Sequence, residues 1–268
     1  MPKAWDGVIK IPISGRSSKP RTTGITMIID KGLGLERASD LLETAGEYID
    51  IIKLTFGTSA FYDEDYLQRK NKLITSYEVD VMPGGTFLEV AYWQDNLSSY
   101  LERAKKLGFT AIEVSDGTID IPLPHRQEII KQALDQGFKV ITEVGKKDPK
   151  QALPISLTHE LINTDAESGA FKVIIEAREA GRGVGIYDSS GQIKEDEIDN
   201  IVAGVDNPEI LLWEAPLKNQ QQALIMRWGV NVNLGNIPPD EILALEALRQ
   251  GLRGDTLRQA YRQGQDKT

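Results

Sequence analysis

The sequence predicts a single (β/α)8 barrel of the TIM type, an α/β fold. Short runs of apolar and β-branched residues alternate with longer segments of helical periodicity, and eight such units can be counted along the chain. The length of 268 residues also suits one barrel domain. An open, doubly wound sheet is the alternative, but such sheets more often have about five or six strands.

The expected strands share one feature, since each apolar run stops at a polar, glycine-rich or proline-containing segment. They cover residues 24–29, 49–54, 79–82, 110–114, 140–142, 171–175, 210–213 and 230–234. The expected helices are 35–46, 63–76, 97–107, 124–136, 195–203, 219–228 and 239–251, with none assigned after the fifth strand. Asp63 has the side chain of an N-cap, and Gly108 and Gly137 end two of the helices.

The two ends of the chain differ from this repeat. Residues 1–23 contain three prolines and the string S-S-K-P-R, which is typical of an extended arm or cap. We therefore expect an N-terminal arm at 1–23 and a barrel at 24–268, with a C-terminal tail from about residue 257.

Composition limits the chemistry that the protein can perform. The chain has no cysteine and two histidines, so disulfides and thiolate sites are excluded, and His125 and His159 are expected outside the active site. The net charge of −9 argues against nucleic acid as a partner. No apolar run could span a membrane and the N-terminus lacks a hydrophobic signal region, so we expect a cytoplasmic protein.

In a parallel barrel the carboxyl ends of all strands face one mouth, which collects polar residues that the sequence scatters. The residues expected to converge there are Asp30, Lys53, Glu113, Asp116, Glu143, Glu176, Glu214 and Asn233. Glu143, Glu176 and Glu214 end three successive strands and are candidates to hold Mg²⁺, which prefers oxygen ligands. Glu113 and Asp116 are further candidates, although Asp116 in S-D-G-T could equally stabilise a turn.

An anionic substrate would need local positive charge or backbone N–H groups in so acidic a protein. Candidate substrate-binding residues are Lys31, Lys53, Gly84, Gly85, Thr86, Arg182, Lys218, Asn233, Gly235 and Asn236, and Arg178 is a candidate for bidentate contacts. The run G-R-G-V-G at 181–185 does not have dinucleotide-binding spacing and does not open a helix.

Eight strings, in order from about Gly24 to Thr256, resemble those of the phosphosulfolactate synthase family. They are I-I-D-K-G-L, P-G-G-T, E-V-S-D-G-T, T-E-V-G-K-K, I-I-E-A-R-E-A-G-R-G-V-G, E-A-P-L-K-N-Q-Q, V-N-L-G-N-I and L-R-Q-G-L-R-G-D-T. The resemblance implies a lyase on a (β/α)8 barrel that adds sulfite to phosphoenolpyruvate with Mg²⁺, giving (2R)-phospho-3-sulfolactate for coenzyme M biosynthesis. It also implies a homo-oligomer.

The family's proposed acid lies in the G-K-K segment, so the resemblance assigns protonation of the intermediate to Lys147. Lys146 and Arg178 are the other candidate catalytic residues, and we expect Lys146 and a metal to lower the pKa of Lys147. Leu54-Thr55-Phe56 and Ala177 are less typical of the family and bear on substrate preference.

Two other functions remain open from the sequence. One is another Mg²⁺-dependent barrel lyase or isomerase that works through an enolate of a phosphorylated carboxylate, because the same carboxylate cluster would serve it. The other is a non-catalytic barrel relative, against which the charges gathered at one mouth argue.

Overall fold

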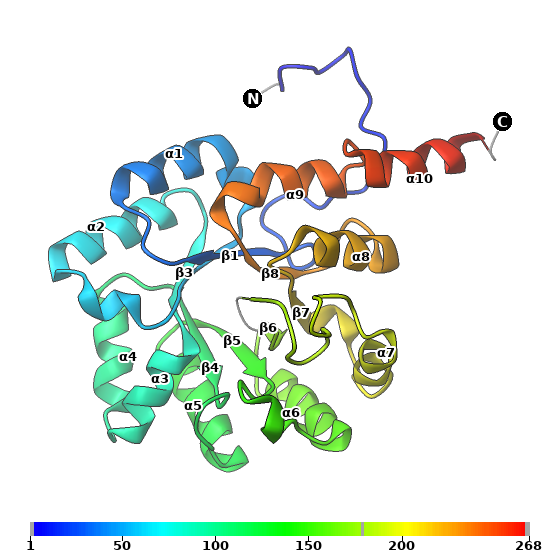
Figure 1. Cartoon of the computed structure of the whole chain (residues 1–268). Helices are drawn as coiled ribbons and strands as arrows, with labels where there is room; N and C mark the ends of the chain where they lie inside the picture. The colour runs from blue at the N-terminus through cyan, green and yellow to red at the C-terminus, as the bar shows by residue number, and fades with distance from the viewer. Residues whose placement is uncertain (1–2, 178–179, 266–268) are drawn as a thin grey trace.

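The computed structural model describes residues 3–177 and 180–265, with side chains to residue 262, and confirms the expected barrel (Figure 1). The strands are β1 (Thr26–Asp30), β2 (Ile51–Leu54), β3 (Asp80–Pro83), β4 (Ala111–Ser115), β5 (Lys139–Val144), β6 (Lys172–Ile175), β7 (Leu211–Glu214) and β8 (Leu234–Ile237). They form one sheet in the order β3-β2-β1-β8-β7-β6-β5-β4, and every hydrogen-bonded pair is parallel.

Helices surround the strands as an outer layer (Figure 1). They are α1 (Leu35–Ala45), α2 (Glu64–Thr75), α3 (Gly85–Trp93), α4 (Leu97–Lys106), α5 (Leu123–Asp135), α6 (Ile155–Glu167), α7 (Glu195–Ala203), α8 (Lys218–Trp228), α9 (Ile242–Arg249) and α10 (Gly254–Gln265). Short 3-10 turns are η1 (Gly46–Tyr48), η2 (Thr58–Phe61), η3 (Pro149–Gln151), η4 (Pro208–Ile210) and η5 (Pro239–Glu241). Within the described ranges, no helix is both long and apolar enough to cross a membrane.

The barrel is nearly closed, with its seam between β3 and β4. Thr110, just before β4, donates its backbone N–H to Val81 O over 3.1 Å, and its hydroxyl accepts the N–H of Val81 over 3.0 Å. The same hydroxyl donates to Asp80 Oδ1 over 2.9 Å. Thr110 therefore joins two strands that do not form a regular ladder.

Inside the barrel, an apolar layer supports a charged one. Successive side chains of a strand point to opposite faces, so residues two apart share the interior. The apolar layer consists of Ile25, Met27, Ile51, Met82, Ala111, Ile141, Ile174 and Leu212, all buried. Two residues further along five of these strands the inward positions are Lys53, Glu113, Glu143, Glu176 and Glu214. A larger apolar cluster fills the space between strands and helices.

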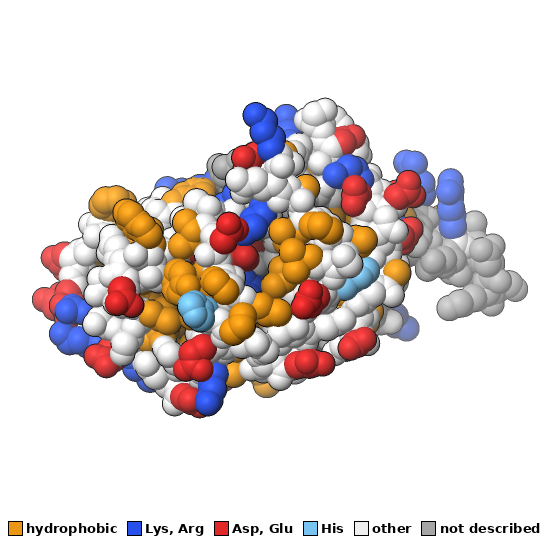
Figure 2. Space-filling model, turned by 90° about the horizontal axis from the view of Figure 1, so that it is seen from below, with side chains coloured by type: hydrophobic (Ala, Val, Ile, Leu, Met, Phe, Trp, Pro, Cys, Tyr) orange, Lys and Arg blue, Asp and Glu red, His pale blue; other side chains and the backbone are white. Residues whose placement is uncertain are grey.

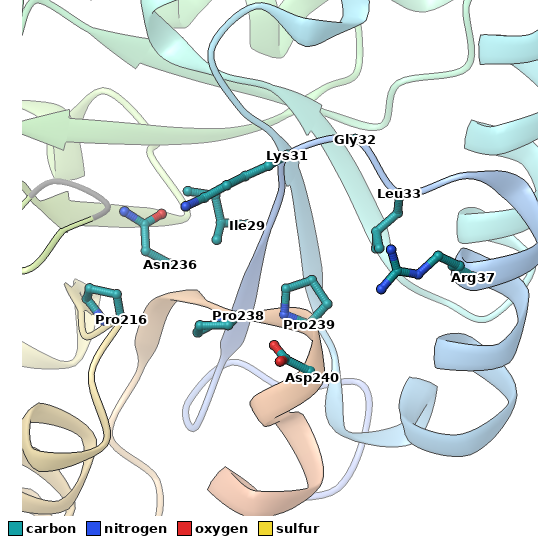
Figure 3. A pocket seen from close by; sticks show the side chains of 10 residues that line it. All are labelled: Ile29, Lys31, Gly32, Leu33, Arg37, Pro216, Asn236, Pro238, Pro239 and Asp240. Atoms are coloured by element: carbon teal, nitrogen blue, oxygen red, sulfur yellow. The ribbon is translucent and has the colours of Figure 1, made fainter.

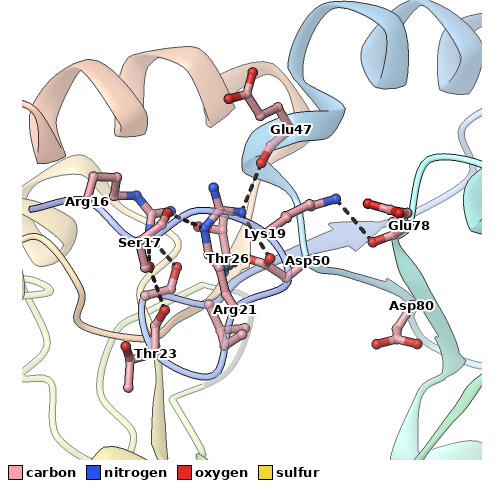
Figure 4. A network of polar contacts seen from close by, with 12 residues as sticks. Arg16, Ser17, Lys19, Arg21, Thr23, Thr26, Glu47, Asp50, Glu78 and Asp80 are labelled. Atoms are coloured by element: carbon pink, nitrogen blue, oxygen red, sulfur yellow. Dashed lines mark hydrogen bonds and ion pairs between the residues drawn. The ribbon is translucent and has the colours of Figure 1, made fainter.

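Residues 16–24 cross the opposite end of the barrel, which we call the floor (Figure 4). Arg21 donates to Asp50 Oδ1 over 3.0 Å and to Glu47 O over 2.9 Å, just before β2. Lys19 Nζ donates to Glu78 O over 3.2 Å, just before β3. These contacts hold the segment to the amino ends of the strands.

The eighth strand was expected at 230–234, and this position is wrong, since β8 is Leu234–Ile237. Apolar and polar residues alternate from Val230 to Leu234 and not beyond, so the pattern favours 230–234 over the observed strand. Asn233 lies on the floor, where its Oδ1 accepts the N–H of Ile25 over 3.0 Å. Helices α3, α6 and α10 were not expected, and α10 occupies the region assigned to a tail.

Candidate active site

A cavity of about 310 Å³ opens at the mouth, where the carboxyl ends of the strands meet. Its lining residues are Ile29, Lys53, Thr55, Phe56, Gly84, Gly85, Thr86, Glu113, Thr118, Glu143, Lys147, Glu176, Glu214 and Asn236. Four glutamates from β4, β5, β7 and the residue after β6 therefore share one space with two lysines. We call these six side chains the charged cluster: Lys53, Glu113, Glu143, Lys147, Glu176 and Glu214.

Lys53 reaches from β2 into the carboxylates of the opposite strands. Its Nζ lies 2.9 Å from Glu113 Oε2 and 3.3 Å from Glu143 Oε2. Glu214 Oε1 lies 3.8 Å from the same nitrogen. Burial alone would lower the pKa of Lys53, but the three carboxylates raise it, so this side chain stays an ammonium ion.

Lys147 approaches the cluster from the loop after β5. Its Nζ lies 2.8 Å from Glu143 Oε1 and 3.2 Å from Glu176 Oε2. Burial opposes the charged form, but Glu143 and Glu176 raise the pKa of Lys147 above its ordinary value. The expectation that Lys146 lowers this pKa is wrong, because Lys146 turns toward Asp116 and Asp120, 3.1 Å and 2.9 Å away.

The carboxylates outnumber the ammonium groups, and their pKa values reflect it. Burial raises the pKa of Glu113 to about 7 despite the nearby Lys53. Burial and the charge of Glu143 raise the pKa of Glu176 well above the usual range, and burial also raises that of Glu214. Glu143 differs, since Lys147 and Lys53 overcome burial and hold its pKa below the usual range. Protons therefore neutralise part of the negative charge of the charged cluster at neutral pH.

The charged cluster fits a divalent cation in its chemistry. All of its acidic donors are carboxylate oxygens, which Mg²⁺ prefers, and the four glutamates, once deprotonated, would carry two more charges than Lys53 and Lys147 balance. Among the described residues no three acidic or imidazole side chains stand ready as a metal cluster, because the ammonium groups of Lys53 and Lys147 lie between the carboxylates. Binding would require the carboxylates to turn from an ammonium group to the ion.

Asp116 and Lys146 lie beside the cavity and do not line it. Asp116 Oδ1 accepts from the buried Arg126 over 3.2 Å, and Arg126 also donates to the carbonyl oxygen of Glu143 over 3.0 Å. Asp165 holds the other side of the guanidinium over 2.6 Å and 2.8 Å. Asp116 thus forms part of a structural network under the β4 and β5 loops. Asp30 likewise points outward and pairs with Lys70 over 2.7 Å.

A second cavity, of about 430 Å³, adjoins the mouth cavity and shares Ile29 and Asn236 with it (Figure 3). The side chains of Lys31 and Asn236 point toward each other there (Figure 3). Asn236 is held at φ 53°, and its buried Oδ1 has no hydrogen-bond partner among the described residues. These two side chains therefore offer polar groups where the two cavities meet.

Gly84, Gly85 and Thr86 form the start of α3 and line the mouth cavity. The N–H of Gly85 donates to Glu113 Oε1 over 3.0 Å. A Cβ at Gly85 would lie 2.4 Å from Ser115 Oγ, so only glycine lets α3 approach β4 this closely.

The remaining candidates lie farther out. Gly235 is inside β8, paired with Glu214 in the ladder, so it does not form a loop. Arg182 is exposed, and Lys218 at the start of α8 pairs with Asp255, so neither lines the mouth cavity. Arg178 lies outside the described residues.

Phe56 is a strained residue at the mouth. Its φ of 57° is in the left-handed region, which costs a non-glycine residue roughly 1–2 kcal/mol. Its ring is 54% exposed and lies 5.9 Å from Lys31 Nζ. Strain and exposure of a large aromatic residue at one position are typical of a functional site.

Sequence reasoning missed two buried charged residues that organise the mouth, Arg126 on α5 and Glu89 on α3. Arg126 is fully buried and Glu89 is 2% exposed. The sequence did contain a signal for both residues, since each is a charged residue on the apolar face of its helix. A charged side chain in that position requires a partner inside the fold.

Comparison with known proteins gives a consistent result. A family model described as (2R)-phospho-3-sulfolactate synthase (ComA) matches residues 14–255. The chain is 44% identical to the phosphosulfolactate synthase of Methanothermobacter thermautotrophicus over 244 residues, which covers 90% of this chain and 94% of the relative. It is 46% identical to that of Methanocaldococcus jannaschii over 235 residues, 87% and 93% of the two chains. For the Bacillus subtilis relative the values are 37% over 253 residues, 94% and 98%.

Solved structures support the fold. Phosphonopyruvate hydrolase, solved with oxalate and Mg²⁺, superposes with a TM-score of 0.54 at 15% identity, covering 90% of this chain and 83% of that one. For 3-hexulose-6-phosphate synthase from Salmonella typhimurium the TM-score is 0.53 at 12% identity, with coverages of 84% and 97%. At these identities the likeness concerns the barrel alone.

Proposed function

The chain belongs to the phosphosulfolactate synthase family, and from that premise we propose that it adds sulfite to phosphoenolpyruvate at the mouth cavity with Mg²⁺ as cofactor. Phosphosulfolactate synthase is a lyase-type enzyme that forms a carbon–sulfur bond. The observation that carries the proposal is the buried charged cluster, where four carboxylates face two ammonium groups in one cavity. A non-catalytic barrel would gain nothing from this arrangement, because burying unbalanced charge is costly.

Glu143, Glu176 and Glu214 are the proposed Mg²⁺ ligands, with Glu113 as an additional one. These side chains share the cavity and, once deprotonated, carry more negative charge than Lys53 and Lys147 balance. Bound there, Mg²⁺ would stabilise negative charge that develops on the substrate carboxylate and offset the glutamate charges that raise the pKa of Lys147. Asp116 is left out of this set because Arg126 and Lys146 already occupy its oxygens.

The phosphate group needs positive or N–H donors away from the carboxylates. Lys31, Asn236 and Thr86 near the start of α3 supply such donors, whereas the N–H groups of Gly84 and Gly85 already donate to Leu54 O and Glu113 Oε1. We propose that these residues hold the phosphate, so that the substrate carboxylate points to the charged cluster. Lys31 lines the second cavity and Asn236 lines both cavities, which leaves room for the phosphate outside the charged cluster.

Lys147 is the proposed general acid. Attack of the sulfite sulfur on the methylene carbon would place an electron pair on the adjacent carbon and carboxylate, and the carbon that bears the phosphate must then accept a proton. Lys147 Nζ carries such a proton in the cavity, held by Glu143 and Glu176. Lys53 stays charged and balances the carboxylates, so it serves as a fixed positive charge.

The assay that tests the function measures phosphoenolpyruvate consumption with and without sulfite, and with and without chelator. We expect consumption only when sulfite and Mg²⁺ are both present. Consumption without sulfite would instead support another enolate-forming lyase or isomerase.

Substitution of Lys147 tests the acid. Lys147→Ala should lower kcat by roughly 10²- to 10⁴-fold with a much smaller change in KM, because the acid acts only in the chemical step. Lys147→Arg should fail similarly, since guanidinium hardly gives up its proton near neutral pH. Lys146→Ala is the matched control. Loss of turnover in Lys146→Ala with turnover kept in Lys147→Ala would move the acid to Lys146.

We also propose that the enzyme is a homo-oligomer. Large apolar side chains are exposed on the arm and on the C-terminal helix, among them Trp5, Val8, Ile9 and Leu257. Apolar side chains also gather across the middle of the face that contains α3 and α6, seen in Figure 2. Contiguous apolar surface of this kind is typical of contact between subunits.

A further inference from the structure

The loop between β4 and α5 lies directly against Lys147. The N–H of Lys147 donates to Gly117 O over 3.0 Å. A Cβ built on Gly117 would lie 2.8 Å from Lys147 Nζ and 3.3 Å from its Cγ. Gly117 therefore forms a wall that the lysine side chain follows toward Glu143 and Glu176, and only a residue without a side chain leaves room for it.

One buried carboxylate on α3 holds this loop in place. Glu89 Oε2 accepts the N–H groups of Thr118 and Ile119 over 2.9 Å and 2.8 Å. Its Oε1 accepts the hydroxyl of Ser115 over 2.7 Å. Glu89, which is 2% exposed, therefore makes three hydrogen bonds to residues on both sides of Gly117. These bonds fix the loop from the interior of the protein.

The geometry points to Glu89 as a positioning residue for Lys147, acting through the loop 115–119. This inference rests on the proposed function, in which Lys147 is the acid. Glu89 touches neither Lys147 nor the cavity among the contacts of the described residues, and Thr118, which it holds, lines the cavity. Its contribution is to keep the Gly117 wall against the ammonium group, so that Lys147 Nζ stays between Glu143 and Glu176.

Glu89→Gln and Gly117→Ala test this inference at two points. The glutamine retains the size of the side chain but removes its charge, so the bonds to the loop N–H groups lose their charge-assisted strength, and the Ser115 hydroxyl must turn to accept from the new amide. The alanine leaves the three Glu89 bonds intact and displaces only the lysine. Gly117 is outside the left-handed region of φ, so alanine brings no backbone strain there. Gly254→Ala is the matched control, since nothing lies within 4 Å of its added Cβ.

We expect both variants to lower kcat roughly 10- to 100-fold, because misplacing a catalytic group by about 1 Å slows the chemical step by this factor. The KM for phosphoenolpyruvate and the Mg²⁺ requirement should stay within about threefold of the parent. Reductive methylation of Lys147, followed by mass spectrometry, should be faster in both variants and unchanged in Gly254→Ala. Thermal unfolding verifies that each variant is folded.

The two readouts separate the inference from the proposed function. Faster methylation with unchanged kcat would support positioning by the loop and refute Lys147 as the acid. Unchanged methylation and unchanged kcat in a folded Gly117→Ala would overturn the positioning inference. If Glu89→Gln does not fold, Ser115→Ala takes its place, since it removes one of the three Glu89 bonds and leaves the buried carboxylate; unchanged methylation and unchanged kcat in a folded Ser115→Ala would overturn the role of Glu89.

Discussion

If the charged cluster holds the proposed Mg²⁺, protonation of its carboxyl groups is coupled to metal binding. Glu113 has a pKa of about 7, raised by burial, and the pKa values of Glu176 and Glu214 are raised as well. A carboxyl group that keeps its proton near neutral pH must lose it before it can bind Mg²⁺. Proton and metal therefore compete for the same oxygens.

Mg²⁺ affinity of the substrate-free enzyme should consequently rise with pH. For one displaced proton with a pKa near 7, the dissociation constant should fall roughly tenfold between pH 6 and pH 8 and level off above. Titration calorimetry at several pH values measures this. Glu113→Gln should flatten the dependence, whereas an affinity that decreases with pH would contradict the assignment of these carboxylates to the metal.

The inward positions of the charged residues could be predicted from the strands alone. Lys53, Glu113 and Glu143 each lie one residue before the end of an apolar run, and the period of two places them inside once one position of the strand is inside. Roles that depend on tertiary partners could not be predicted. Asp116 follows a strand, as a metal ligand of the barrel mouth would. Its structural role becomes visible only in the fold, where Arg126 donates to it.

Elements were harder to predict where their pattern was ambiguous. Helix α3 has no polar face, since Leu88, Glu89 and Ala91 are all buried, and it starts with glycines that read as a loop. The apolar–polar alternation covers residues 230–234, directly before β8 (Leu234–Ile237). The position of the strand therefore depends on contacts at the floor and not on its own sequence pattern. The backbone carbonyls of Val230 and Val232 accept from Arg249, over 2.6 Å and 2.8 Å, which holds that segment outside the sheet.

Closure of the barrel at the β3–β4 seam should depend strongly on one side chain, Thr110. Thr110→Val keeps the shape but removes the hydroxyl that serves Val81 and Asp80. We expect the free energy of unfolding to fall by about 1–3 kcal/mol, because a partly buried N–H and a carboxylate lose their partner. Urea denaturation measures the change.

Thr44→Val is the control for the seam variant. The hydroxyl of Thr44 is exposed and donates to carbonyl oxygens of its own helix, Asp40 and Leu41. Its loss should cost much less. Equal destabilisation by both variants would show that the seam does not depend on the Thr110 hydroxyl.

At the scale of the whole molecule, the arm and the C-terminal helix expose apolar side chains that one chain does not cover. Trp5 is 66% exposed and Val8 is 74% exposed. Sedimentation at micromolar concentration should therefore give a multiple of the chain mass, and Trp5→Ser with Val8→Ser should shift the distribution toward the single chain. Sedimentation of the parent as a clean monomer would refute the homo-oligomer.

The carboxylates of the barrel interior lie on one side of the mouth cavity. The glutamates come from β4, β5, β7 and the residue after β6, and Lys147 comes from the loop after β5, while Ile29, Gly84, Gly85 and the charged Lys53 lie on the side of β1 to β3. A planar substrate lying against Ile29, Gly84 and Gly85 would present one of its two faces to Lys147. Protonation by Lys147 from that face alone would give one handedness at the new stereocentre, and the description of the matching family model names a single one, 2R.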